Sequence, residues 1–282
     1  MKALTRILLT LMVLALAGPA AMAHDDHDHD HDHDHGHDHV DIWPSFHVSE
    51  GEFEIGGASL DESVTPSVIE LHPHVRLFMA DLDDAGGFGD SDAPGLLAPE
   101  NGDPDYPEHY LPPGGTLTVK WVAPVMEWNE TTEAFDTQAG ESMYMTVDSV
   151  NLFVTPSSTG TTVEGVEFTI DSHGDIHGHP DYRLFNGTTS SPSAPDDGIY
   201  LTQMIIELDD AVGGVFDSEV IYTVYALNAT EEEHEHAAEW VHEEFGVEGI
   251  GDHDHDHVIP EPASIALIGL GGLALARRRR RA

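Results

Sequence analysis

The chain has 282 residues, with 53 acidic side chains against 10 basic ones and a formal net charge of −43. Such a charge repels phosphate backbones, because affinity for nucleic acid comes from Lys and Arg side chains that neutralise phosphates. We therefore expect no nucleic acid partner. The chain has 21 His and no Cys, which leaves imidazole and carboxylate as the ligands for any metal site.

The first 23 residues have the pattern of a secretory signal. Lys2 and Arg6 precede an apolar run at residues 7–17, and the small residues at 21–23 suit cleavage by signal peptidase. The apolar run spans about 16 Å as a helix, which is too short to cross a membrane. The sequence therefore predicts an exported protein whose mature form begins at His24.

Two tracts alternate His with Asp, one at residues 24–39 and a shorter one at residues 252–257. The first contains no apolar side chain, so we expect it to be disordered. A flexible tract of this kind can curl around Zn²⁺, Ni²⁺ or Cu²⁺ at several interchangeable sites, with protons competing as the pH falls. The alternative is a charged spacer that binds no metal. The candidate ligands in the tracts are His24, His27, His29, His31, His33, His35, His37, His39, His253, His255 and His257.

Between the tracts, residues 40–251 alternate β-rich runs with Gly, Pro, Asp and Ser, which is typical of an antiparallel β-sandwich. The alternation is clearest at residues 116–122, where Leu, Val and Trp share one face of a strand. The predicted fold class is therefore mainly β, as one large sandwich or a duplicated pair. The expected strands are residues 45–55, 68–79, 116–126, 143–154, 163–170, 200–208 and 220–227.

Two segments of the chain are similar in sequence, which is relevant to whether the body is a duplicated pair of sandwiches. The segment at residues 72–78 (HPHVRLF) resembles residues 179–185 (HPDYRLF). Arg76 and Arg183 occupy matching positions, where we expect each guanidinium to pair with a carboxylate. Chance similarity within a biased composition is the alternative explanation for the echo.

Residues 230–245 are predicted to form an amphipathic helix. Thr230 and Glu233 have the spacing of a capping box, and Gly246 is placed to end the helix. His234 falls in the middle of the apolar face. A histidine in that position is either a hydrogen-bonded core residue or a metal ligand.

The loop at residues 173–179 is the best candidate for a metal site in the body. Its Gly residues permit tight curvature, Asp175 and Asp181 lie close in sequence, and His234 is a further candidate ligand. Three imidazoles near a carboxylate meet the requirements of zinc. The imidazoles of the loop are those of His173, His177 and His179.

Two other chemistries are less well supported by the sequence. Residues 81–92 partly match a calcium-binding EF-hand loop, but Ala85 replaces a ligand, so we interpret the segment as a solvated acidic turn. No nucleophile elbow, phosphate loop or dinucleotide fingerprint occurs, and we expect no enzymatic activity. A zinc hydrolase built on the loop at residues 173–179 is the catalytic alternative.

The C-terminal residues 259–282 have three parts. Pro260, Glu261 and Pro262 precede an apolar stretch at 263–276, and five Arg follow at 277–281. This arrangement closely resembles the PEP-CTERM sorting signal of Gram-negative bacteria that make exopolysaccharide. The resemblance implies recognition by a membrane-embedded exosortase, processing near the Pro-Glu-Pro, and delivery to the cell surface or the extracellular matrix.

The whole architecture loosely resembles the zinc-responsive, His-rich surface-anchored proteins of some bacteria, on the strength of its tracts and of His177 and His179 followed by Tyr182. The resemblance implies metal capture outside the cytoplasm. We expect a non-enzymatic protein that crosses the inner membrane, is held transiently by its C-terminal helix, and binds divalent transition metals, zinc above all. The alternative is a structural protein of the exopolysaccharide matrix with only loose binding of Ca²⁺ or other metals.

Overall fold

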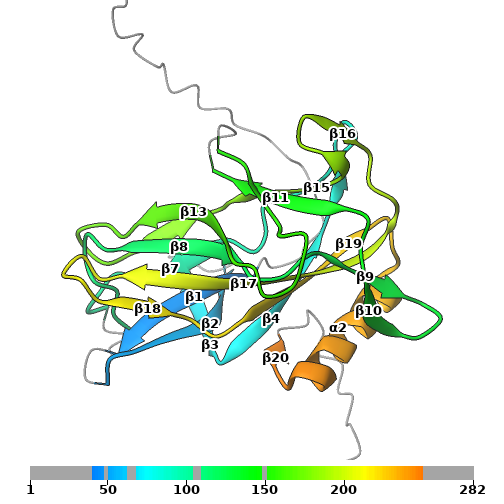
Figure 1. Cartoon of the computed structure of the whole chain (residues 1–282). Helices are drawn as coiled ribbons and strands as arrows, with labels where there is room; N and C mark the ends of the chain where they lie inside the picture. The colour runs from blue at the N-terminus through cyan, green and yellow to red at the C-terminus, as the bar shows by residue number, and fades with distance from the viewer. Residues whose placement is uncertain (1–39, 48–49, 62–67, 104–108, 148–150, 250–282) are drawn as a thin grey trace, which may run out of the picture. The chain divides into compact units, whose positions relative to one another are not determined.

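The computed structural model describes residues 40–47, 50–61, 68–103, 109–147 and 151–249. This part of the chain is mainly β, with several sheets and one helix near its C-terminal end (Figure 1). The predicted fold class is therefore confirmed. The predictions for the two tracts and for both terminal signals concern residues outside the described ranges.

The strands, in chain order, are β1 (Val40–His47), β2 (Glu52–Asp61), β3 (Val68–Pro73), β4 (Val75–Asp81), β5 (Asp83–Asp84), β6 (Gly89–Ser91), β7 (Leu96–Ala98), β8 (Thr116–Trp121), β9 (Met126–Asn129), β10 (Ala134–Gln138), β11 (Ser142–Thr146), β12 (Phe153–Val154), β13 (Val163–Thr169), β14 (Ile176–Gly178), β15 (Asp181–Thr188), β16 (Ser191–Ser193), β17 (Gly198–Asp209), β18 (Val215–Asp217), β19 (Ile221–Leu227) and β20 (Glu248–Gly249). Within the described ranges, the one helix is α2 (Glu231–Phe245).

Four of the expected strands are each two strands in the structure, so those predictions are wrong. Residues 45–55 contain the end of β1, a turn, and the start of β2, and Gly51 takes a left-handed φ of 70° in that turn. Residues 68–79 break at His74, whose φ is 73°. Residues 116–126 divide into β8 and β9, and residues 143–154 into β11 and β12.

The strands of the described ranges form three sheets. One has the order β14-β7-β1-β2-β3, the largest follows the path β10-β9-β17-β19-β4-β20, and the third follows β12-β11-β15-β6-β5. Most pairs are antiparallel, but β1 with β7, β19 with β4, and β20 with β4 are parallel. Ile42, Trp121 and Leu184 come from different sheets and belong to one hydrophobic cluster, so the sheets share a core.

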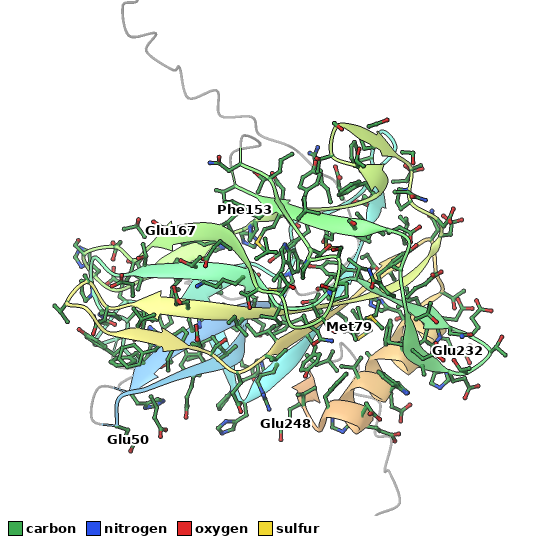
Figure 2. The ribbon with its side chains drawn as sticks, in the orientation of Figure 1. Glu50, Met79, Phe153, Glu167, Glu232 and Glu248 are labelled. Carbon is green, nitrogen blue, oxygen red and sulfur yellow. The ribbon has the colours of Figure 1, made fainter. Side chains whose placement is uncertain are left out.

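Acidic side chains occupy the outside of this core. Glu50, Glu167, Glu232 and Glu248 are exposed and point away from the ribbon (Figure 2). The charges of these four side chains are therefore at the surface, where water and salt screen them.

Helix α2 confirms the prediction for residues 230–245. Thr230 and Glu233 form the expected capping box, and Gly246 ends the helix with a left-handed φ of 63°. The helix buries Ala237 and Val241 in a second hydrophobic cluster with residues of β17 and β19. Within the described residues, no helix combines the length and the apolar character needed to cross a membrane.

Both Arg residues of the internal echo have the carboxylate partners that the sequence predicts. Arg76 lies 3.0 Å from Glu219, and Arg183 lies 3.3 Å from Asp90. The echoed segments differ in pairing, because β4 is parallel to β19 whereas β15 is antiparallel to β11 and β6. The strand topology therefore lends the duplication no support.

A buried histidine makes the stability of the body depend on pH. His109 accepts the indole N–H of Trp43 on its Nδ1 atom at 2.9 Å, and burial lowers the pKa of His109 to about 4. In the unfolded chain the same group has a pKa of about 6.5. Between these two values the unfolded state binds more protons, so the free energy of unfolding decreases as the pH falls.

We predict that protonation of His109 in the unfolded chain lowers the free energy of unfolding by about 2 kcal/mol when the pH falls from 7 to 5. Urea unfolding of the unaltered protein and of His109→Gln at both pH values measures this loss. Gln can still accept the hydrogen bond from Trp43 but does not titrate, so the variant should lose less stability by that amount. Equal losses in the two proteins would contradict the prediction.

Candidate metal centre

Three short segments meet at one edge of the five-stranded sheet. Strand β7 lies between β1 and β14, because Leu96 pairs with Ile42 on one side and Leu97 lies opposite His177 on the other. Asp41 belongs to β1 and His177 to β14. The sheet thus brings together two polar residues that lie far apart in the sequence.

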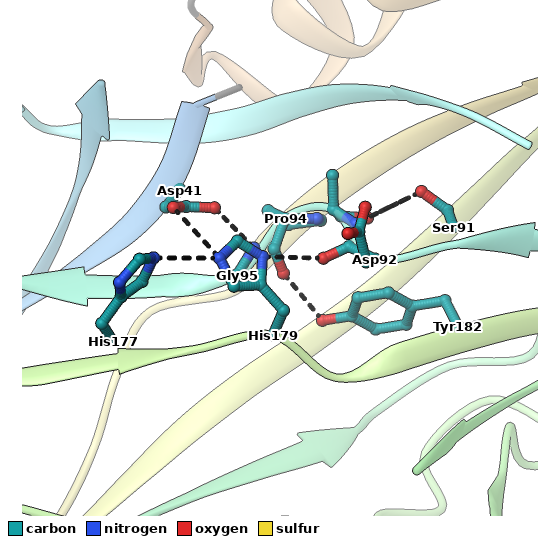
Figure 3. Close-up of polar contacts among 9 residues, drawn as sticks. Asp41, Ser91, Asp92, Pro94, Gly95, His177, His179 and Tyr182 are labelled. Carbon is teal, nitrogen blue, oxygen red and sulfur yellow. Dashed lines mark hydrogen bonds and ion pairs between the residues drawn. The ribbon is translucent and has the colours of Figure 1, made fainter. Parts of the chain in front are cut away.

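Asp41, His177 and His179 converge at this edge (Figure 3). One ligand atom from each lies within 4.8 Å of the others. The Nε2 atoms of His177 and His179 are 3.1 Å apart, and Nε2 of His179 is 3.9 Å from Oδ2 of Asp41. Two ligands of a tetrahedral zinc lie about 3.3 Å apart when the bonds are about 2.0–2.1 Å long. The observed separations lie on either side of that value.

The end of β14 allows the two imidazoles to approach each other. In a continuous strand, residues i and i+2 lie about 6.6 Å apart on one face, but β14 ends at Gly178, so His179 is outside the strand. A Cβ atom on Gly178 would lie 2.7 Å from Cε1 of Phe168. A larger residue at position 178 would therefore disturb the segment that joins the two histidines.

Hydrogen bonds orient two of the three side chains. Nδ1 of His179 donates to the backbone carbonyl of Asp92 at 3.2 Å, which leaves its Nε2 atom as an acceptor. Oδ1 of Asp41 accepts the N–H of Gly95 at 2.8 Å, and its Oδ2 atom lies toward His179. Partners of this kind fix the orientation of metal ligands and their tautomers.

The segment that supplies these partners, residues 92–95, is itself held by buried groups. The hydroxyl of Tyr182 donates to the carbonyl of Pro94 at 3.1 Å, and Tyr182 is fully buried in the core. Burial raises the pKa of Tyr182 far above its ordinary value, so the hydroxyl stays protonated and remains a donor. The backbone N–H of Ala93 donates to Ser91 at 3.3 Å.

The three side chains differ in exposure. Asp41 is 5% exposed, whereas His177 and His179 are exposed to solvent. A cation bound here would take its carboxylate from the protein side and would face water on the other. The charge of Asp41 would offset half of the charge of a divalent ion, which makes its partial removal from water less costly.

The other predicted ligands of the body lie elsewhere. His173 is exposed in a turn where Oδ1 of Asp171 accepts its backbone N–H. Asp175 faces Asp171, and the hydrogen bond between their carboxyl groups raises the pKa of Asp175. Within the described ranges, Asp41, His177 and His179 are the group of three or more side chains arranged to hold an ion.

His234 is a core residue with hydrogen-bond partners. Its side chain is buried, its Nε2 atom donates to the carbonyl of Val224 at 2.9 Å, and its Nδ1 atom lies 3.6 Å from Asp81. Burial lowers the pKa of His234, so the ring stays neutral at neutral pH. The structure does not bring it to the two histidines of the β14 segment.

The sequence analysis did not identify Asp41 as a candidate ligand, because it expected the first strand to begin at residue 45. The structure begins β1 at Val40, so Asp41 interrupts an otherwise apolar run. A carboxylate in a buried strand position needs a partner, and this was the signal available in the sequence. The candidate ligands of both tracts, and Pro260, Glu261 and Pro262, lie outside the described residues.

Comparison with known families identifies the C-terminal segment. Residues 258–281 match the PEP-CTERM protein-sorting motif. The chain is an exported protein with a PEP-CTERM motif. The motif marks it for transient anchoring in the membrane and for sorting by an exosortase, as the sequence predicted.

Other comparisons add little about the body of this PEP-CTERM protein. No curated protein matches the chain, so the resemblance to His-rich surface-anchored proteins has no support. Among solved structures, the CooA pilin subunit from enterotoxigenic Escherichia coli is similar at 10% sequence identity and a TM-score of 0.21, over 68% of this chain and 99% of the pilin. A similarity at this level supports no inference about fold or function.

Gly95 tests whether the arrangement depends on close packing. A Cβ atom at this position would lie 2.6 Å from Nδ1 of His179 and 2.8 Å from Oδ1 of Asp41. We predict that Gly95→Ala lowers the free energy of unfolding by about 1–3 kcal/mol, because the methyl group forces both side chains apart. Urea unfolding measures the change. Gly140→Ala is the matched control, since nothing lies within 4 Å of its added Cβ atom, and an equal loss there would contradict the explanation.

Proposed function

We propose that this exported PEP-CTERM protein binds divalent transition metals outside the cytoplasm, with zinc as the preferred ion, and that it catalyses no reaction. The convergence of Asp41, His177 and His179 on one point carries the proposal. They come from two segments that lie far apart in the sequence, β1 and the β14 segment, and backbone groups already orient Asp41 and His179. A centre arranged in this way loses little side-chain entropy when an ion binds.

The protonation of the two imidazoles also supports metal binding. Because Nε2 of His179 is an acceptor, Nε2 of His177 carries the proton in the 3.1 Å contact between the rings. An ion that binds both Nε2 atoms requires His177 to move this proton to its Nδ1 atom, so both rings stay neutral. Metal affinity should therefore fall with decreasing pH, because protons compete for the same nitrogen atoms.

The ligand set favours zinc over calcium. Two imidazole nitrogens and one carboxylate suit Zn²⁺, which takes three protein ligands and a water molecule in open sites. Ca²⁺ requires six to eight oxygen ligands, and the centre contains one carboxylate. The structure of this edge therefore gives no support to calcium as its ion.

The tracts have a complementary role in the proposal. Their eleven histidines provide many weak and interchangeable sites, whereas the body provides one site with a fixed geometry. A protein with both can collect ions at its ends and retain one at its centre. We assign it no reaction, because the sequence contains no recognisable catalytic motif.

The decisive experiment measures zinc binding in a protein whose two tracts have lost their histidines. In a protein whose tract histidines are all replaced by Asn, calorimetry at pH 7.5 should show one zinc per chain. Adding His177→Gln and His179→Gln should weaken binding by at least about 100-fold, because changes to supporting residues alone cost 10–100-fold. Binding should also be weaker at pH 5.5, where protons compete.

The chain contains a matched control for this experiment. His72 and His74 have the same spacing as the pair in the β14 segment, but lie in and after β3. The variant His72→Gln with His74→Gln should bind zinc as tightly as the protein with silenced tracts. Less than one zinc per chain at micromolar metal, or equal losses from the two pairs, would contradict the proposal.

A further inference from the structure

The backbone of residues 92–95 orients ligands on both sides of the proposed centre. The carbonyl of Asp92 accepts the Nδ1–H of His179 at 3.2 Å, and the amide of Gly95 donates to Oδ1 of Asp41 at 2.8 Å (Figure 3). A displacement of this short segment would therefore move the hydrogen-bond partners of two ligands at once.

Tyr182 holds the segment at two points. Its backbone lies opposite Ser91 in the pairing of β15 with β6, and its hydroxyl donates to the carbonyl of Pro94 at 3.1 Å. Asp92 lies between these two points in the chain. The carbonyl that orients His179 thus belongs to a stretch of backbone that one tyrosine fixes from both sides.

The position of Tyr182 is itself fixed by the core. Its strand pairs with β11 and with β6. The ring is 1% exposed and packs against Trp121 and Tyr225, at centroid separations of 6.1 Å and 5.8 Å. Tyr182 also follows His179 by three residues, so one stretch of chain supplies a ligand and the group that positions that ligand's partner.

We propose that Tyr182 is a positioning residue of the metal centre, which sets the affinity and the geometry of the ion through the backbone of residues 92–95. The inference rests on the proposed metal centre and deepens it. Tyr182 does not touch the ion, because its hydroxyl is engaged with Pro94. Loss of a residue that supports metal ligands costs about 10–100-fold in affinity, and Tyr182 acts one step further out, so we expect about tenfold.

The variant Tyr182→Phe isolates the hydroxyl, because the ring keeps its contacts in the core. Pro94 is buried, so its carbonyl would be left without a hydrogen-bond donor, which is unfavourable. The segment gains by moving until this carbonyl finds a new partner. That movement displaces the carbonyl and the amide that orient the two ligands.

Tyr200→Phe is the matched control. Tyr200 is also buried in the core, and its hydroxyl donates to a backbone carbonyl, that of Asp196, at 2.6 Å. It belongs to β17 of the largest sheet, and Asp196 lies outside residues 92–95. The two variants therefore lose the same kind of hydrogen bond, but only one loses it at the segment that orients the ligands.

The test measures zinc affinity by calorimetry at pH 7.5, in the full chain with Asn in place of every tract histidine. Tyr182→Phe should bind zinc about tenfold more weakly, and Tyr200→Phe within about twofold of the parent protein. Both should lower the midpoint of urea unfolding without metal. The visible absorption of bound Co²⁺, which reports ligand geometry, should change in Tyr182→Phe alone, whereas a loss of stability by itself would not alter it.

A milder variant acts on the same segment from outside the core. Oγ of Ser91 accepts the backbone N–H of Ala93 at 3.3 Å, so Ser91→Ala should also weaken zinc binding, by more than about twofold. This variant decides the question if Tyr182→Phe does not fold, and unchanged affinity would then overturn the inference. Where Tyr182→Phe folds, equal affinities or equal Co²⁺ spectra in the two Phe variants would overturn it.

Failure of this inference differs from failure of the proposed function. If the parent protein without tract histidines binds less than one zinc per chain, the metal centre itself is wrong. If it binds one zinc and the two Phe variants bind it equally well, the centre stands and Tyr182 serves only the stability of the core.

Discussion

A carboxylate buried in a β-strand must find a partner, and Asp41 finds it in the backbone N–H of Gly95 at 2.8 Å. This contact fixes the position of residues 92–95 relative to β1. The carbonyl of Asp92 in the same segment then orients His179, and the buried hydroxyl of Tyr182 holds the carbonyl of Pro94. Together with the backbone hydrogen bond from Ile42 to Gly95, this carboxylate orders the segment that orients His179.

The chain has few basic residues to balance its acidic side chains. Arg76, Lys120 and Arg183 are the basic residues between the two terminal signals. Each is already close to an acidic side chain, and Lys120 lies between Glu207 at 2.8 Å and Glu164 at 3.3 Å. Most acidic groups of the protein must therefore be balanced by ions from solution, which is consistent with a protein that gathers cations.

The proposal distinguishes two kinds of metal ligand. The tracts would bind through composition, because they offer many similar imidazoles. The sheet edge would bind through geometry, because the side chains of Asp41 and His179 already have hydrogen-bond partners that orient them. Export and exosortase sorting, which the PEP-CTERM motif indicates, place the protein outside the cytoplasm.

The sequence by itself determined the features that depend on local pattern. The β-rich body followed from alternation and turn residues, the capped helix α2 from Thr230, Glu233 and Gly246, and the sorting motif from a contiguous run of residues. The histidine pair of the β14 segment was recognisable for the same reason. Strand ends were predicted less well, because short turns at Gly51 and His74, both with a left-handed φ, divide single β-rich runs into β1 and β2 and into β3 and β4.

Only the tertiary structure decided which side chains share a site. Asp41 joins His177 because β7 pairs with β1 on one side and with β14 on the other, and no local pattern encodes that pairing. Tertiary packing also separates His234 from the two histidines of the β14 segment. Helix α2 packs its apolar face against the large sheet, and this buries His234 in the core. A ligand set drawn from distant strands depends on register, and register is set by the packing of the whole core.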